Sequence, residues 1–493
     1  MEFDEQQQVR IEKLHALREA GVEPYPVRTE RSLTNTEATE QFAQREGETH
    51  TLVGRVMLKR DSGKIAFLTV RDGSGENADG TIQFLGQFNN LGTEGFAFLT
   101  KMLDMGDIVQ GTGTLIRSRR GEISLDLTNI TLLAKALSPL PDKHKGLRDV
   151  EQRYRRRALD LVDNAESRRV AILRSRIVAA MRRYMDGQGF LEVETPVLQP
   201  LYGGAAARPF TTHHNALDQT FYLRIADELY LKRLIAGGLE RVYEISKDFR
   251  NEGLDRFHNP EFTMMECYQA YADYHAMMAV VEGVYAYITD EVFGTRTITY
   301  GEHTIDLSPP WPRIPLRDAI LRASDIDYMA VEDTEELRRR ARDAGADVPD
   351  DMVRARIIDE MLKHFVRPHL IQPTFLIDYP VELSPLAKRT PADSRVVERF
   401  QPFIAGSEAG NAYTELNDPL DQLARFEEQG RARAAGDAEA MPVDEDYVLA
   451  LMQGMPPTGG LGIGIDRLVM LFTNQPSIRD VILFPALRST EGL

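Results

Sequence analysis

The chain has 493 residues, of which 42% are hydrophobic and 27% charged, and it carries a formal net charge of −17 and a single cysteine. This composition is typical of an ordered protein of about three domains, and one cysteine excludes a disulfide within the chain. The acidic balance argues against nonspecific coating of nucleic acid, although it allows a local basic face. No uncharged apolar run approaches about 18 residues and the first residues lack the apolar core of a signal peptide, so we expect no membrane partner and a cytoplasmic location.

The first part of the chain predicts a small β-barrel. After an N-terminal helix and lead-in over residues 1–50, the domain expected at 51–137 holds five strand-like stretches with a helical interruption before the fourth, which is the pattern of an OB-fold. Such barrels bind single-stranded nucleic acid by stacking bases on aromatic rings and following the backbone with cations. The candidates for this face are Phe67, Gln83 and Glu122. The alternative is a barrel that packs against the rest of the chain and binds nothing.

Residues 138–160 are expected to form a linker, which the prolines at 139 and 141 stiffen. Four arginines stand close together near its end, at positions 153, 155, 156 and 157. They could contact an RNA phosphate or cap an acidic surface of the protein itself. The second interpretation is slightly favoured.

The remaining residues, 161–493, are expected to form an α+β domain. An amphipathic helix over 165–187 leads to a strand that ends at Pro196. Alternation predicts an antiparallel hairpin over 241–271. The charged, helical region 313–370 reads as an insertion that packs on one side of a sheet. Near the end, a glycine-rich strand runs into an apolar helix within 458–471.

The hairpin gathers residues that suit an anionic ligand. Arg250 stands at the end of its first strand, and a planar guanidinium can donate two parallel hydrogen bonds to a phosphate or carboxylate. Carboxylates on the same sheet face could hold a metal ion or an ammonium group. The alternative is a solvated hairpin with surface ion pairs, which are common and weak.

Three segments in order resemble the three motifs of the class II aminoacyl-tRNA synthetases. They are the long helix with its strand to Pro196, the Phe-Arg-Asn-Glu run at 249–252 with its charged return strand, and the glycine-rich strand that meets its helix at Arg467. Further segments resemble the lysyl-tRNA synthetases in particular, and this resemblance covers nearly the whole chain. The segments are Gly-Gly-Ala-Ala-Ala-Arg-Pro-Phe at 203–210, Thr-His-His-Asn-Ala-Leu-Asp at 212–218, Glu-Leu-Tyr-Leu-Lys-Arg-Leu at 228–234, His-Asn-Pro-Glu-Phe-Thr-Met at 258–264 and Asn-Ala-Tyr-Thr-Glu-Leu-Asn-Asp-Pro at 411–419.

The resemblance implies an antiparallel sheet flanked by helices and a two-step reaction. Lysine attacks the α-phosphate of ATP to give lysyl-adenylate, and the lysyl group then passes to the terminal ribose of tRNA(Lys). The implied partners are ATP, L-lysine, tRNA(Lys) and a second copy of the chain in a homodimer joined through motif one. In the barrel, Phe67 should stack on an anticodon base while Gln83 and Glu122 bond to base edges.

The resemblance also assigns roles to site residues. Arg250 and Arg467 should compensate phosphate charge as the catalytic pair. The full ATP-binding set is Arg250, Glu252, His258, Asn259, Phe262, Glu408 and Arg467. Because lysine carries two ammonium groups, its pocket should be rich in carboxylates, unless these pair with Lys or Arg inside the fold. The lysine-binding set is Gly204, Glu228, Glu266, Tyr268, Asn411 and Glu415.

Mg²⁺ is the expected cofactor, bridging the ATP phosphates through hard oxygen ligands. Glu408 matches one ligand of the family. A second acid is usual seven positions earlier, where this chain has Gln401, and Ser407 replaces a usual arginine. An amide oxygen can bind magnesium but adds no charge, so Gln401 is a doubtful ligand.

Three rival interpretations remain open. An aspartyl- or asparaginyl-tRNA synthetase shares the barrel and sheet, but its acidic or amide substrate does not suit a pocket rich in glutamate. A ligase that modifies a protein with lysine resembles the catalytic half alone. A catalytically weakened RNA-binding paralogue would be consistent with Gln401.

Overall fold

The computed structural model describes residues 2–141, 146–434 and 441–488. The chain forms two compact units, Met1–Ile172 and Leu173–Leu493. Each unit has its own strands, and the two are described separately below. Among the described residues, no helix is both long and apolar enough to cross a membrane.

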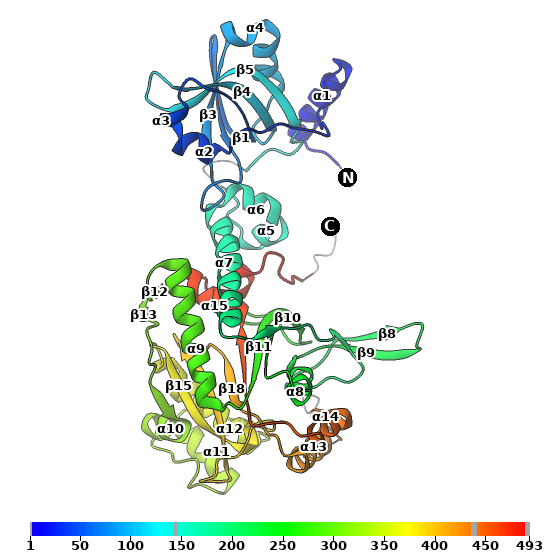
Figure 1. The fold of residues 1–493 in the computed structure, drawn as a ribbon, viewed down its shortest axis with the longest axis vertical. Helices are drawn as coiled ribbons and strands as arrows, with labels where there is room; N and C mark the ends of the chain where they lie inside the picture. Colours follow the sequence, from blue (N-terminus) through cyan, green and yellow to red (C-terminus); the bar gives the residue numbers. More distant parts are fainter. Residues whose placement is uncertain (1, 142–145, 435–440, 489–493) are drawn as a thin grey trace. The chain divides into compact units, whose positions relative to one another are not determined.

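The first unit is a closed five-stranded barrel preceded by short helices (Figure 1). The strands pair in the order β1-β2-β3-β5-β4, and closure comes from the parallel pairing of β3 with β5. Along β2 every second residue is buried, which turns Ala66, Leu68 and Val70 into the barrel core. The elements are α1 (Glu5–Glu19), α2 (Asn35–Glu40), α3 (Phe42–Arg45), β1 (Thr49–Ser62), β2 (Ile65–Arg71), β3 (Thr81–Gln87), α4 (Phe88–Ala97) with a π-helical turn (Phe98–Met102), β4 (Ile108–Arg117) and β5 (Ile123–Ala134).

The expected linker is partly helical. Its end forms α5 (Val150–Arg155) and α6 (Arg157–Asp163), while residues 142–145 lie outside the described part of the chain. The arginines here pair with acids of the same unit: Arg153 and Arg157 both bond to buried Asp160, at 2.9 and 2.5 Å, and Arg155 bonds to Glu151. The contacts favour the capping interpretation of this cluster over an RNA contact.

A long helix, α7 (Ala165–Gly187), begins where Asn164 Oδ1 accepts hydrogen bonds from the backbone N–H groups of Glu166 and Ser167. After it comes the main sheet of the second unit, with the strand order β14-β15-β16-β18-β19-β11-β10-β6 and β17 paired to β16. The pairings are antiparallel except at the two edges, β14–β15 and β10–β6. The strands are β6 (Leu191–Glu192), β10 (Arg241–Phe249), β11 (Glu261–Ala270), β14 (Arg313–Pro315), β15 (Thr374–Pro380), β16 (Val396–Ile404), β17 (Ser407–Glu408), β18 (Asn411–Thr414) and β19 (Thr458–Gly464).

Helices cover this sheet, so the predicted α+β class, an OB barrel plus an antiparallel sheet flanked by helices, is confirmed. Helix α9 contacts β16, β18 and β19, and α15 contacts β11, while α8 contacts β10 and β11 (Figure 1). The expected helical insertion shares a core with the sheet, through Leu376, Tyr379 and Phe403. The helices are α8 (Glu228–Ala236), α9 (Tyr274–Ile288), α10 (Leu316–Ser324), α11 (Thr334–Asp343), α12 (Arg354–Met361), α13 (Pro419–Ala434), α14 (Glu445–Met452), α15 (Ile465–Thr473) and α16 (Ile478–Val481).

Two smaller sheets complete the second unit. One joins β7 (Leu198–Gln199), β9 (Gln219–Leu223) and β8 (Thr211–His214), and the other is the hairpin of β12 (Thr297–Tyr300) and β13 (His303–Asp306). The strand expected to end at Pro196 is shorter than predicted, since only residues 191 and 192 pair with β10.

Candidate active site

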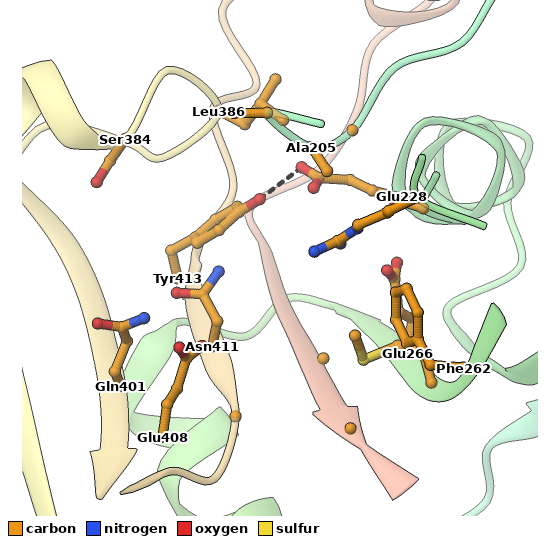
Figure 2. Close-up of a pocket in the computed structure, with 18 of the residues that line it drawn as sticks. Ala205, Glu228, Phe262, Glu266, Ser384, Leu386, Gln401, Glu408, Asn411 and Tyr413 are labelled. Atoms are coloured by element: carbon orange, nitrogen blue, oxygen red, sulfur yellow. Dashed lines mark hydrogen bonds between the residues drawn. The ribbon is translucent and has the colours of Figure 1, made fainter. Parts of the chain in front are cut away.

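The second unit contains a cavity of about 710 Å³ on one face of the main sheet. Every site residue predicted for this domain lines it, although they come from segments more than 260 residues apart. These residues are Gly204, Glu228, Arg250, Glu252, His258, Asn259, Phe262, Glu266, Tyr268, Gln401, Glu408, Asn411, Glu415 and Arg467. Figure 2 shows side chains of α8, β11 and the β16–β18 region turned toward this common space.

Arg250 lies at the end of β10, where its backbone N–H donates to Pro260 O at 2.9 Å and closes the hairpin loop. Its guanidinium carbon lies 5.0 Å from the centre of the Phe262 ring, a distance suited to a cation–π contact. Its Nε faces Ile225 O at 3.3 Å. Within the described residues no carboxylate lies at ion-pair distance from Arg250, so its charge is available to an anion in the cavity.

Arg467 owes its position to its neighbour Asp466. The buried Asp466 carboxylate accepts from the Thr263 backbone N–H at 2.7 Å and from Arg174 Nη1 at 2.6 Å, which ties the first turn of α15 to β11 and α7. Arg467 then faces the cavity, with Nη2 3.1 Å from His258 Nε2 and Nη1 3.8 Å from Glu408 Oε2. A cation so placed can meet a phosphate in the cavity.

The hairpin loop is fixed by its own side chains. His258 Nδ1 lies 2.7 Å from Asp255 Oδ2. Asn259 is buried: its Nδ2 donates to Glu261 O at 2.5 Å and its Oδ1 accepts from Ala486 N–H at 3.1 Å. Asn259 therefore shapes the loop, while His258 and Glu252 are exposed loop side chains at the cavity, with His258 already in contact with Asp255 and Arg467.

The acidic end of the cavity differs from the sequence expectation in one respect. Glu228 and Glu415 both form ion pairs with Lys232 Nζ, an internal cation that is fully buried one turn further along α8. The Tyr413 hydroxyl also donates to Glu228 Oε1 at 2.6 Å (Figure 2). The expectation that a ligand cation completes these glutamates is therefore wrong for one of their two charges, because Lys232 supplies the alternative partner within the fold.

Two carboxylate positions stay open to a ligand. Glu415 Oε1 has no hydrogen-bond partner among the described residues, although it is buried. Glu266, opposite Glu244 across the β10–β11 ladder, accepts from the Tyr268 hydroxyl at 3.1 Å. Burial, followed by the charges of nearby acids, raises the pKa of the Glu266 carboxyl well above its ordinary value. An ammonium group brought into the cavity would satisfy both carboxylates.

A buried acid cluster lies behind this pocket. Arg224 bonds to Glu244 at 2.7 Å and lies 3.1 Å from Asp227 and 3.5 Å from Asp248, all of them buried. One guanidinium faces three carboxylates, so the cluster holds excess acid. Burial, with Asp248 nearby, raises the pKa of Asp227 to about 8, and burial raises that of Asp248 to about 6.

The residues fit a magnesium ion only in part. Glu408 is half-buried and offers a carboxylate to the cavity. Gln401 is buried and its Oε1 already accepts a hydrogen bond from the Tyr379 hydroxyl at 2.7 Å. In the described part of the chain, no group of three or more His, Cys, Asp or Glu side chains is arranged to hold a metal. A magnesium ion here would take most of its oxygen ligands from a bound nucleotide.

The three predicted anticodon residues lie together on the barrel of the first unit. Phe67 on β2 is half-buried, and Arg60 on β1 faces its ring at 6.0 Å. Gln83 on β3 donates to Ser124 Oγ at 3.0 Å and lies 3.4 Å from the exposed Glu122. The structure thus brings an aromatic ring, an amide and a carboxylate to one patch beside a cation.

Several residues at the cavity were not predicted. Arg399 donates to Asn411 Oδ1 at 2.8 Å and to Ser384 Oγ at 2.9 Å, and so holds Asn411 at the cavity wall. Lys232 likewise positions two predicted residues, Glu228 and Glu415, whereas Arg224 holds the buried acids behind the pocket. The spacing of Glu228 and Lys232, four apart on a helix, could have revealed one of these pairs. Arg224 carries a weaker signal, since Asp227 follows it by three residues but its other partners, Glu244 and Asp248, come from β10.

Comparison with known proteins is consistent with this geometry. Residues 149–488 match the family model described as tRNA synthetases class II (D, K and N), and residues 50–133 match the OB-fold nucleic acid binding domain. The chain therefore belongs to the class II tRNA synthetases. The two family matches together account for both units: the barrel, and the antiparallel sheet with its cavity.

Within that class, the chain is similar to proteins named lysine–tRNA ligase. It is 55% identical to the one from Roseiflexus sp. (strain RS-1), over 99% of each chain. It is 54% identical to that of Chloroflexus aurantiacus, again over 99% of each, and 49% identical to that of Bacillus subtilis (strain 168), over 99% of this chain and 98% of the relative.

Proposed function

We propose that this chain is an ATP-dependent, AMP-forming lysine–tRNA ligase. It activates L-lysine to lysyl-adenylate and transfers the lysyl group to the 3′-terminal adenosine of tRNA(Lys). The observation that carries the proposal is one cavity lined both by two arginines, Arg250 and Arg467, and by the glutamates at positions 228, 266 and 415. A nucleoside triphosphate and a doubly cationic amino acid are the ligand pair that suits both sets of charges.

The chemistry needs positioning and charge compensation more than covalent help from the protein. Arg250 would hold the α-phosphate and the lysine carboxylate, which places the attacking oxygen beside the phosphorus atom. Arg467 would give up its contact with His258 and bind the γ-phosphate. Phe262, whose ring lies beside Arg250, would offer a stacking surface for adenine, and Glu252 would meet the adenine edge.

The acidic pocket would hold the two ammonium groups of lysine. Glu266 and the free oxygen of Glu415 are the acceptors, and Tyr268 forms the wall beside them. Gly204 and Asn411 lie at the cavity rim, where Gly204 has a φ of +88° and allows the backbone to turn close to Glu228.

Magnesium is the proposed cofactor. Glu408 would hold it together with phosphate oxygens, and the ion would neutralise charge on the triphosphate. Gln401 would contribute at most a neutral oxygen, because its amide is already bonded to Tyr379.

The barrel, assigned to residues 51–137, would read the anticodon through Phe67, Gln83 and Glu122. Residues 161–493 would form the catalytic domain, with the insertion at about 313–370. Uridine-rich anticodons present donors and acceptors that an amide and a carboxylate can match.

We further propose a homodimer in the cytoplasm. The edge strand β6 and the segment after it leave Leu191 and Leu198 about half exposed, at 52% and 47%, beside α7. A second copy of this edge would cover them. Sedimentation at micromolar concentration should give twice the mass of one chain, and a single-chain mass would reject the dimer.

The function is tested by ATP–pyrophosphate exchange with single amino acids. We expect exchange that depends on L-lysine and is absent with L-aspartate or L-asparagine. Exchange with either of those two instead would favour a sister enzyme of the class. No exchange with any of them, with tRNA still bound, would favour a weakened RNA-binding paralogue. Attachment of lysine to a protein rather than tRNA would indicate a protein-modifying ligase.

A further inference from the structure

An internal lysine lies beside the proposed lysine-binding residues, but it does not line the cavity. Lys232 lies on α8 with none of its surface exposed. Its Nζ lies 2.6 Å from Glu228 Oε1 and forms an ion pair with Glu415 Oε2. The rings of Tyr413 and Tyr447 face the same ammonium at 5.6 and 5.8 Å. The side chain therefore lies behind Glu228 and Glu415 and does not line the cavity itself.

Lys232 remains charged in this setting. Burial by itself lowers the pKa of a lysine, but the carboxylates of Glu228 and Glu415 outweigh it and raise the pKa of Lys232 well above its ordinary value. The cation is thus a permanent part of the pocket and not a competitor that a ligand displaces.

The charges of the pocket can be counted from these contacts. Glu228 and Glu415 share the Lys232 ammonium, and Glu266 forms no ion pair among the described residues. With all three carboxyls ionised, two negative charges are uncompensated, and because burial raises the pKa of Glu266, a bound cation is what stabilises this ionised form. Glu415 shares its carboxylate: Oε2 binds Lys232, and Oε1 has no partner among the described residues. A substrate with two ammonium groups matches this deficit, whereas an amino acid with a neutral side chain leaves a buried charge unpaired.

We propose that Lys232 is a specificity-determining residue. It is an internal counter-ion that positions Glu228 and Glu415, and it leaves the three ionised glutamates with two uncompensated negative charges. The inference rests on the proposed lysine activation. Lys232, although it lies outside the cavity, matches the charge of the pocket to a doubly cationic substrate. Without Lys232, the two glutamates would repel each other and turn or take up protons.

The test compares Lys232→Ala with the wild type in ATP–pyrophosphate exchange. Alanine removes three carbons and the ammonium group, which is the structure of n-propylammonium. We expect the KM for L-lysine to rise roughly a hundredfold, because removing one partner of a buried ion pair leaves the other uncompensated, while kcat changes much less. Added n-propylammonium should lower the KM again, and propan-1-ol, of the same size without charge, should not.

Controls separate the possible failures. Lys247→Ala removes a half-exposed lysine of β10 that pairs with Glu261, and it should leave the KM unchanged. If the alanine variant does not fold, Lys232→Met fills the same volume and supplies the same KM comparison. A wild-type KM in a folded variant, or equal rescue by propan-1-ol, would overturn the inference. Absence of lysine-dependent exchange in the wild type would instead reject the proposed function.

Discussion

At the scale of single residues, the site depends on which charges are already paired. Arg467 is held near Glu408 and His258, whereas Arg250 faces an aromatic ring and a carbonyl. Two of the pocket acids share an internal lysine, and the third, Glu266, is bonded to a tyrosine. No acidic partner has to be displaced before Arg250 binds an anion, so we expect Arg250 to contribute most to the chemical step.

Replacing Arg250 with glutamine should lower kcat for lysine-dependent ATP–pyrophosphate exchange by about 10² to 10³, the cost of removing one donor that stabilises developing charge. Arg241→Lys is the matched control, because this exposed arginine lies at the far end of the same strand. Steady-state exchange of both purified variants measures the difference. A loss below about fivefold in the Arg250 variant would be incompatible with its role at the α-phosphate.

Gln401→Glu should lower the magnesium concentration that gives half-maximal adenylate formation. The new carboxylate can still accept the bond from the Tyr379 hydroxyl and adds a negative charge near Glu408. A magnesium titration of the exchange reaction at saturating ATP provides the measurement. Identical titration curves for the variant and the wild type would show that position 401 does not contact the metal.

At the scale of elements, the central strand β19 forms the floor of the pocket because four of its seven residues are glycine. A Cβ placed on Gly460 would collide with the Glu415 carboxylate and lie 2.5 Å from Tyr268 Cε1. Neighbouring Gly462 would meet nothing closer than Met264 Sδ at 3.6 Å. The strand thus permits two functional side chains to lie flat over its backbone at one particular position.

Gly460→Ala should therefore raise the KM for lysine more than the KM for ATP, by about tenfold or more, since a small overpacking of a tight site costs about 1–3 kcal/mol. Gly187→Ala, at the open end of α7, has free space around its Cβ and serves as the control. The two KM values are read from exchange kinetics. Equal effects on both substrates would indicate a general distortion of the sheet.

The barrel face is a second element with a separate task. Phe67→Ala should weaken charging of tRNA by about 1–3 kcal/mol, the usual contribution of one stacked base, and leave ATP–pyrophosphate exchange intact. Phe88→Ala offers a comparable half-buried aromatic of the same unit that packs on Phe96 instead. Aminoacylation and exchange are measured side by side. A parallel loss of both activities would contradict separate roles for the two units.

At the scale of the whole molecule, the buried acids around Arg224 link stability to pH. The pKa of Asp227 is raised to about 8, from an ordinary value near 4, so the folded chain holds a proton that the unfolded chain releases across that range. This contribution to stability is complete at low pH and is lost as pH rises toward 8. Asp248 has a pKa of about 6, so its contribution to stability is lost as pH rises toward 6 and does not change further above that pH.

Between pH 6 and pH 8 the free energy of unfolding should thus fall by up to about 1.4 kcal/mol per pH unit, and Asp227→Asn should flatten this slope. The single tryptophan, Trp311, is buried in the second unit, so its fluorescence during urea unfolding reports on that unit. Asp347→Asn, at an exposed position, is the control. An unchanged slope in the Asp227 variant would place the titrating group elsewhere.

The class, the barrel, the sheet and the identity of most cavity residues could all be predicted from the amino-acid sequence. Alternation and helical periodicity are local properties, and motif residues such as Arg250 and Arg467 stand at recognisable places in them. Only the packing of the folded chain shows which charges from distant segments are neighbours. Glu415 lies beside Lys232, and Glu244 and Asp248 on β10 lie beside Arg224. Ion pairs between distant segments depend on how strands and helices pack, and no local pattern in the chain encodes that proximity.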